Sequence, residues 1–257
     1  MLQEKTVKLY NGKVQLKFVT DGADKHEYYD EKGKRLYGTT YYTGVIDKSS
    51  ALMGWVSKMM SLYLCDKIKE GIKITEGIVG SAKTEYRKVQ REEADRGKEI
   101  HKWISDWIAG EKPEMPEDEG VVNGITAFLR FQKKYKVKWL KSERLVYSKK
   151  FKVPGTLDAL GEISKDLVLF DFKSSKPSSI SPDGIYPEYA IQTGGYQLEY
   201  EEETGKKIKY RIVIALDKKT GEFRFRKFED NEKDKKAFLA CLQLKNRLNE
   251  IKKNGAR

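Results

Sequence analysis

The stretch "LVLFDFKSS", residues 167–175, joins an apolar run to two charged residues and sets the strongest constraint on the fold. Residues 167–170 predict a strand that enters a core, and successive side chains of a strand point to opposite faces. Phe172 therefore continues one packed face, while Asp171 and Lys173 share the other. Because burying an unpaired charge costs several kcal/mol, the end of this strand must pair these charges or bind a ligand.

A second carboxylate, Asp158, lies thirteen residues before Asp171, in the stretch "VPGTLDAL". Two antiparallel strands joined by "GEISK" would bring these carboxylates together, and Gly155 permits a close approach of the backbone. Together with the carbonyl of Phe172 they form a hard-oxygen site for a divalent ion such as Mg²⁺ or Mn²⁺. Placing two carboxylates side by side is unfavourable unless a cation joins them.

The spacing of apolar residues predicts a β-rich appendage over residues 1–45 and a mainly helical part over residues 46–136. The appendage holds two hairpins, one with a type I′ turn at Asn11-Gly12 and one over residues 26–42. In the helical part, helices are expected from residue 49, over 81–109 and over 121–135. A stripe of apolar side chains predicts a buried face on the first of these helices. The stripe is formed by Leu52, Trp55, Val56, Met59, Met60, Tyr63 and Leu64.

A sheet core is predicted over residues 137–230, followed by an amphipathic C-terminal helix over 231–257. Strand patterns cover residues 137–148, 150–160, 166–175, 208–217 and 222–228, and a helix is expected over 188–204. A helix packed between the strands of a small mixed sheet gives the fold class α/β (α+β). We therefore expect the appendage over 1–45 and one domain over 46–257.

The charge balance indicates the class of partner. Lys+Arg 51 against Asp+Glu 39 gives a net charge of +12, which favours a polyanion such as nucleic acid, because neutralised phosphates release counterions. Two cysteines, Cys65 and Cys241, cannot supply a four-cysteine zinc or iron–sulfur site, and we expect reduced packing residues. The N-terminus shows no signal peptide and no apolar run approaches a membrane span, so we expect a cytoplasmic protein with no membrane partner.

The spacing of Asp158 from "DFK" at 171–173 resembles the signature of the PD-(D/E)XK nuclease superfamily. Three motifs occur in the order typical of its RecB-type exonuclease branch, and the chain is similar to phage and mitochondrial genome-maintenance exonucleases. The motifs are Gly155/Asp158, Asp171/Lys173 and Gln192/Tyr196. This resemblance covers roughly residues 40–216 and implies a restriction-endonuclease-like core, with a central mixed sheet flanked by helices.

The resemblance also implies roles for individual residues. Asp158, Asp171 and Lys173 would be catalytic, and Gln192 and Tyr196 would position DNA and the catalytic groups. The two members of this last pair are four residues apart, so one helix face carries both.

Two upstream residues match further elements of the branch. His101, in "RGKEIHKWI", is similar to an extra metal-ligand motif, and Glu143, in "KSERLVY", matches an acid of the first core strand. Glu143 is expected to be catalytic, with an exposed strand residue as the open alternative. The metal set would be His101, Asp158, Asp171 and the backbone carbonyl of Phe172, which would hold one or two Mg²⁺ or Mn²⁺ ions and no iron–sulfur cluster.

These features predict a divalent-metal-dependent DNA exonuclease that acts on single-stranded DNA or free DNA ends in recombination, repair or phage DNA processing. The alternatives are a structure- or sequence-specific endonuclease and a non-catalytic nucleic-acid-binding protein. Phage or host recombination proteins are possible partners in a bacterial or phage-infected cell, and the oligomeric state stays open. Side chains expected to contact DNA are Arg96, Lys98, Ser174, Lys176, Tyr41 and Tyr42.

Overall fold

The computed structural model describes residues 3–20, 26–174 and 181–255. Its contacts divide the chain into two compact units, one of Met1–Ile46 with Glu99–Arg257 and one of Asp47–Lys98. The β-rich N-terminal segment therefore belongs to the unit that carries the main sheet. No helix within the described ranges is long and apolar enough to cross a membrane.

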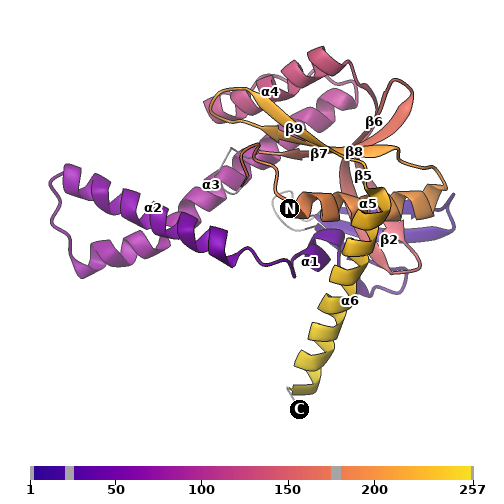
Figure 1. The fold of residues 1–257 in the computed structure, drawn as a ribbon, viewed down its shortest axis with the longest axis horizontal. Coiled ribbons are helices and arrows are strands. Elements are labelled where there is room, and N and C mark those ends of the chain that lie inside the picture. Colours follow the sequence, from indigo (N-terminus) through magenta and orange to yellow (C-terminus); the bar gives the residue numbers. More distant parts are fainter. Residues whose placement is uncertain (1–2, 21–25, 175–180, 256–257) are drawn as a thin grey trace. The chain divides into compact units, whose positions relative to one another are not determined.

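The larger unit is built on a five-stranded mixed sheet (Figure 1). Its strands, in spatial and sequence order, are β5 (Lys138–Ser148), β6 (Val153–Ile163), β7 (Asp166–Lys173), β8 (Tyr210–Leu216) and β9 (Phe223–Phe228). All neighbours are antiparallel except β7 and β8, which run parallel. Parallel neighbours need a crossover connection, and helix α5 (Glu188–Thr204) supplies it. The predicted mixed α/β fold class is confirmed.

Helices cover both faces of this sheet (Figure 1). On one face, α4 (Glu119–Tyr135) and the end of α3 (Glu76–Ile108) pack on Phe170 and Phe172. On the other face, Tyr196 and Tyr200 of α5 pack on Leu169, which confirms the alternation predicted for β7. The Asp118 carboxylate caps α4 by accepting a hydrogen bond from the Val121 amide at 3.0 Å, so α4 begins slightly before the predicted start.

Three glycines allow α5 to approach its neighbours closely. A Cβ on Gly155 of β6 would lie 2.8 Å from Tyr196 Cδ1, and one on Gly195 would lie 2.7 Å from Thr39 Cγ2. A Cβ on Gly194 would lie 2.9 Å from the backbone of Asp234 in α6 (Asn231–Gly255). The helix is thereby held against β6 on one side and against α6 on another, and this packing fixes the motif that contains Tyr196.

The N-terminal segment forms a four-stranded antiparallel sheet of β1 (Gln3–Leu9), β2 (Val14–Thr20), β3 (His26–Tyr29) and β4 (Arg35–Leu36). In the first hairpin Leu9 pairs with Val14, so the turn is two residues longer than the predicted one, and residues 10–12 all have positive φ. The second predicted hairpin ends at Leu36, because residues after it form helix α1 (Thr39–Thr43).

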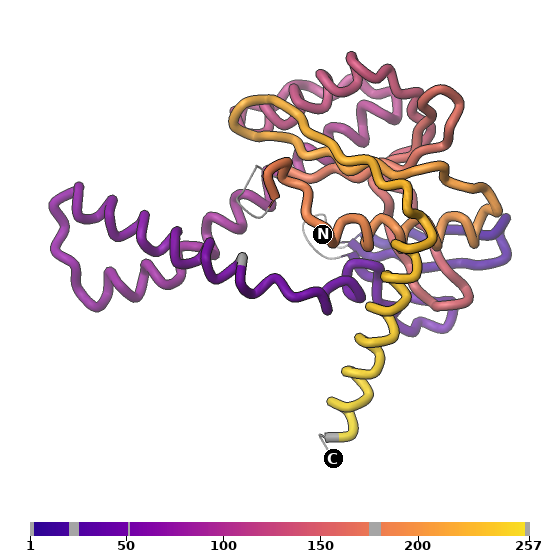
Figure 2. Tube along the Cα trace, in the orientation of Figure 1, coloured from indigo at the N-terminus to yellow at the C-terminus, as the bar shows by residue number. Residues whose placement is uncertain are grey.

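This N-terminal sheet packs against the end of β5. Leu9, Leu16 and Tyr28 form one buried cluster with Leu145 and Tyr147. Figure 2 shows the indigo N-terminal strands beside the hairpin of β5 and β6. The segment is thus anchored by apolar packing to the strand that carries Glu143.

The smaller unit contains α2 (Ser49–Lys69) and the first part of α3. The buried face predicted for α2 is wrong: Leu52 is 49% exposed and the other members of the stripe are only half-buried. Trp55 packs edge-on against Tyr86 at 6.2 Å, which buries part of the stripe within this unit. Cys65 and Cys241 are both free thiols, and Cys65 is exposed, so its expected role in packing is also wrong.

A buried carboxyl group, Glu199, lies on α5 one turn beyond Tyr196. It has no solvent exposure, the Thr39 hydroxyl donates to its Oε1, and its Oε2 has no hydrogen-bond partner among the described residues. Burial raises the pKa of Glu199 well above its usual range, and the Thr39 hydrogen bond offsets only part of this effect. The folded protein therefore holds a proton on Glu199 to a higher pH than the unfolded chain does.

Replacing Gly194 with alanine is expected to destabilise the fold by about 1–3 kcal/mol, because the new methyl group meets the backbone of α6 rather than a movable side chain. Urea unfolding monitored by circular dichroism measures the change. The matched control is Gly80→Ala in α3, where a Cβ meets no atom within 4 Å and helix propensity predicts a gain of up to about 1 kcal/mol. Equal effects of the two substitutions would contradict the close approach of α5 to α6.

Glu199→Gln is expected to stabilise the protein at pH 8 and to change little at pH 4. The unfolded chain releases this proton above about pH 4.3, whereas the folded protein retains it, so wild-type stability falls with rising pH by about 1.4 kcal/mol per unit between the two pKa values. Glutamine carries no proton to release, and this part of the slope disappears. Urea unfolding across the pH range tests the prediction, and an unchanged slope would refute it.

Candidate metal and catalytic site

The hairpin of β6 and β7 places Asp158 beside Asp171. Its last paired residues are Ala159 and Phe170, so the two aspartates lie one position further along neighbouring strands. The Phe172 amide donates to Asp158 Oδ2 at 2.7 Å, which fixes that carboxylate against β7. The turn has Ser164 and Lys165 in the left-handed region, as a two-residue hairpin turn requires. The predicted approach of the two carboxylates is therefore present.

Asp171 is buried and forms an ion pair with Lys173. It is 1% exposed, and the Lys173 Nζ lies 3.0 Å from its Oδ1 and 2.8 Å from its Oδ2. Only the Oδ1 contact has hydrogen-bonding geometry, so Oδ2 has no such donor among the residues that the structure describes. The ammonium also lies 5.0 Å from the centroid of the Tyr189 ring, which holds the lysine on its outer side.

Burial and charge act in opposite directions on this pair. Burial raises the pKa of Asp171, the Lys173 ammonium lowers it in part, and repulsion by Asp158 raises it again. For Lys173 burial lowers the pKa, but the charges of Asp171 and Asp158 outweigh burial and leave it raised. Lys173 is therefore a protonated cation at neutral pH.

Three residues from separate elements form a compact group of possible metal ligands: His101 of α3, Glu143 of β5 and Asp158 of β6. One ligand atom from each lies within 4.8 Å of the others. His101 Nδ1 is 3.7 Å from Asp158 Oδ2, and the imidazole packs edge-on against Phe172 at 6.1 Å. An imidazole and two carboxylates suit Mn²⁺, and the carboxylates alone suit Mg²⁺.

Glu143 has an unusual backbone conformation for a strand residue. Its φ is 44°, in the left-handed region that non-glycine residues rarely adopt, and it lies between the paired residues Ser142 and Arg144. Its position is opposite Asp158, since the flanking residues pair with Ala159 and Leu157. Such conformations cost free energy and are found at functional sites, so the strain is consistent with a ligand role.

The carboxylate of Glu143 is crowded by protein atoms even though its side chain is exposed at the surface. That crowding raises the pKa of Glu143, and repulsion by Asp158 raises it further. A cation bound between Glu143 and Asp158 would remove this repulsion. The donor set and its charge therefore fit a divalent ion.

The ligand group differs from the set predicted from the sequence. Among the side-chain ligands it contains Glu143, whereas Asp171 is outside it. Asp171 is engaged by Lys173, because β7 places both side chains on one face. Its unsatisfied Oδ2 is nonetheless an acceptor buried next to Asp158, where it could contact a bound ion or a second ion.

Gln192 and Tyr196 lie together on α5, as their spacing predicts. The Gln192 Nε2 donates to the Tyr196 hydroxyl at 3.0 Å. Burial raises the pKa of Tyr196 well above its usual range, and the charges of Asp171 and Asp158 raise it further. The phenol is therefore a neutral group close to both aspartates.

The non-aromatic residues expected to contact DNA are Arg96, Lys98, Ser174 and Lys176. Arg96 and Lys98 lie in the unit of residues 47–98 and form ion pairs with Glu93 and Asp95 on the same helix. Ser174 is half-buried and directly follows the catalytic strand, and Lys176 lies outside the described residues. Within the larger unit, Ser174 lies next to the candidate site.

The two tyrosines expected to contact DNA are engaged within the protein. Tyr42 is buried in a cluster with Val153 and Phe238, which leaves little ring surface for a base. The Tyr41 ring stacks on Tyr37 at 4.2 Å and donates its hydroxyl to Asn249. The burial of Tyr42 therefore does not support the expected contact of this residue with DNA.

Sequence reasoning missed two residues next to the site. Tyr189 contacts the Lys173 ammonium, and Glu199 lies beside Gly155, where its Oε2 would be 2.4 Å from an added Cβ. Glu199 follows Tyr196 at a spacing of three, so the helical period alone could have placed it on the same face. No local signal marks Tyr189, because its contact joins two separate elements, α5 and β7.

No family model and no curated protein matches this chain. Among solved structures, it is similar to an alkaline exonuclease, LHK-Exo, from Laribacter hongkongensis, with 15% identity and a TM-score of 0.33 over 62% of this chain and 84% of that one. The complex of LHK-Exo with dAMP is 16% identical to this chain, with a TM-score of 0.32. The match covers 62% of this chain and 85% of that one. A provisionally assigned exonuclease from Eubacterium rectale is 15% identical to this chain, with a TM-score of 0.37. The match covers 57% of this chain and 66% of that one.

Glu143→Gln is expected to raise the Kd for Mn²⁺ at least about 10-fold, because it removes one charged ligand, a loss of about 1.4 kcal/mol or more. Isothermal titration calorimetry measures the affinity, and the thermal shift at saturating Mn²⁺ should shrink with it. The matched control is Glu162→Gln on β6, whose carboxylate pairs with Lys138 and lies outside the ligand group. An unchanged Kd in Glu143→Gln would remove this residue from the site.

Proposed function

We propose that the chain is a divalent-metal-dependent DNA exonuclease of the RecB-type branch, acting on single-stranded DNA or free DNA ends. One observation carries the proposal: His101, Glu143 and Asp158, from α3, β5 and β6, gather next to the buried Asp171–Lys173 pair of β7. Such an arrangement combines ligands for a cation with a separate fixed positive charge. Phosphodiester hydrolysis needs both, because negative charge on the phosphate must be neutralised as the bond breaks.

The ligand group would hold one divalent ion, and the Oδ2 of Asp171, which accepts no hydrogen bond among the described residues, would lie close to it. When bound, the ion would polarise the scissile phosphate and lower the pKa of an attacking water. Asp158 has a second task, since it also accepts the hydrogen bond from the Phe172 amide that joins β6 to β7. The position of this ligand is therefore fixed by the backbone of the neighbouring strand.

Lys173 would act on the phosphate through its charge. Asp171 holds the ammonium from one side and Tyr189 from another, so its position is set before substrate binds. An ammonium fixed in this way can donate a hydrogen bond to a phosphate oxygen and offset the charge that develops there. Gln192 and Tyr196 would position the substrate or Asp171 with a neutral hydroxyl.

The substrate class is supported by the charge of the chain and by the order of its motifs. A net charge of +12 favours a polyanionic substrate. The resemblance of Gly155/Asp158, Asp171/Lys173 and Gln192/Tyr196 to RecB-type exonucleases supports DNA and attack from an end. A role in recombination, repair or phage DNA processing belongs to the same proposal.

The test is degradation of linear and circular single-stranded DNA with Mg²⁺ or Mn²⁺. We expect the wild type to degrade the linear strand and to leave the circle intact, and chelation by EDTA to stop the reaction. Asp158→Asn and Lys173→Met should each lower the rate by about 10²–10³-fold, because each removes a group that acts on the charge of the phosphate.

The matched control is Asp166→Asn, at the opposite end of β7, which should retain the wild-type rate. Cutting of the circular strand would indicate an endonuclease. Binding of DNA with no cleavage under any metal condition would indicate a non-catalytic nucleic-acid-binding protein. Full activity of Asp158→Asn would show that the site lies elsewhere.

A further inference from the structure

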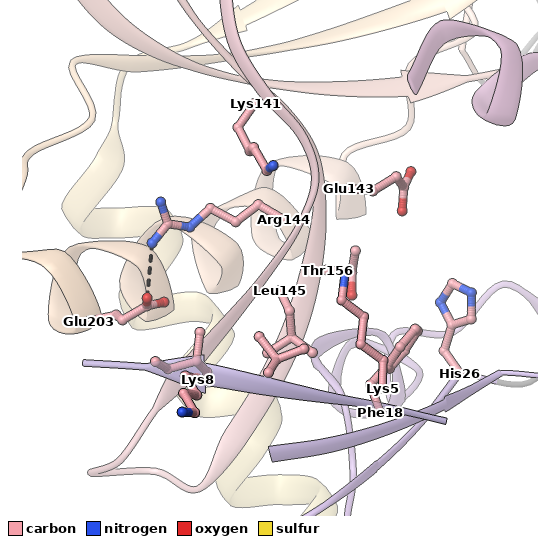
Figure 3. Close-up of a pocket in the computed structure, with 12 residues that line it drawn as sticks. Lys5, Lys8, Phe18, His26, Lys141, Glu143, Arg144, Leu145, Thr156 and Glu203 are labelled. Carbon is pink, nitrogen blue, oxygen red and sulfur yellow. Dashed lines mark hydrogen bonds and ion pairs between the residues drawn. The ribbon is translucent and has the colours of Figure 1, made fainter. Parts of the chain in front are cut away.

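A cavity of about 420 Å³ lies between the N-terminal sheet and the hairpin of β5 and β6 (Figure 3). This volume is within the range of about 300–1,000 Å³ that is typical of ligand sites. Glu143, one of the candidate metal ligands, forms part of its wall. The cavity therefore shares Glu143 with the proposed metal site. Further lining residues are Lys5, Lys8, Phe18, Lys141 and Thr156.

Two lysines on this wall have ammonium groups without a hydrogen-bond or ion-pair partner in the described part of the chain: Lys5 and Lys141. By contrast, Arg144 on the same wall is neutralised by Glu203 at 2.9 Å. Like charges around one cavity repel one another, and an anion bound inside would relieve that repulsion. The positive charge of these lysines thus favours a negatively charged ligand in the cavity.

The alternation of β1 places Lys5 on the side that faces β5. Lys5, Val7 and Leu9 lie on this side, and burial increases from the exposed Lys5 to the buried Leu9. Figure 3 shows the Lys5 ammonium directed toward Thr156, and Lys141 extending from β5 into the same space. Two strands far apart in sequence thus direct cations at the region beside Glu143.

We propose that this cavity binds the phosphates of a single polynucleotide strand next to the phosphate that is cleaved. Lys5 and Lys141 would contact the backbone beside the metal site. The N-terminal sheet would then be part of the substrate groove and not only a support for β5. This inference rests on the proposed nuclease function.

The test measures binding of a fluorescein-labelled single-stranded oligodeoxythymidine in EDTA, where no hydrolysis takes place. The double variant Lys5→Ala/Lys141→Ala should bind on the order of 10-fold more weakly, and the slope of log K against log salt should fall by about 0.7 for each lost contact. The matched control is Lys13→Ala, an exposed lysine in the turn between β1 and β2 that does not line the cavity. It should leave the affinity and the slope unchanged.

A charge-retaining variant separates charge from structure. Lys5→Arg/Lys141→Arg should keep the wild-type salt slope, and all variants should show the wild-type unfolding midpoint and Mn²⁺ affinity. An unchanged slope in the alanine double variant would overturn the proposal, as would an equal loss in the arginine variant or in Lys13→Ala. Because binding is measured without metal, a wild type that cleaves no DNA would refute the nuclease function and leave this test decisive for the groove.

Discussion

The ion pair of Asp171 and Lys173 depends on a strand that is covered on both faces, and much of the fold serves to cover it. Phe170 and Phe172 are packed by α3 and α4 on one side, and Leu169 is packed by α5 on the other. Under these layers a carboxylate loses its water, and it is stable only with a cation beside it. The sheet therefore ends in a charged pair whose geometry is fixed by the same packing that stabilises the protein.

Close approach of α5 is the second requirement of the site. Tyr196 reaches the neighbourhood of Asp171 only because Gly155 has no side chain on the strand below it, and because Gly194 and Gly195 admit α6 and α1 from other directions. The glycines in "VPGTLDAL" and "QTGGY" thus matter because they leave room for neighbouring elements to pack closely, and not because they form turns. The same crowding buries Glu199 with a proton, a cost that the packing of α1 and α5 must offset.

The sequence predicted what depends on local periodicity. The alternation in β7 and the short turn after β6 were enough to place Asp158 beside Asp171, and the strand order follows from short connections. Glu143 was identified as an acid of the first strand, but its place in the ligand group follows from a φ of 44°, which no pattern of side chains indicates. The stripe on α2 had correct helical spacing, yet spacing cannot tell whether a partner covers the face.

Long-range packing accounts for what the sequence left open in the N-terminal segment. Its hairpins predict strands, but only the cluster of Leu9 and Tyr28 with Leu145 shows which part of the sheet they contact. That contact fixes β1 along β5, and Lys5 then faces the cavity next to Glu143 although more than 130 residues separate them. The backbone of Glu143 is strained in the left-handed region, and its side chain lines the same cavity. Long-range packing thus brings a residue that breaks a local rule of strand geometry next to a segment whose contacts no sequence pattern indicates.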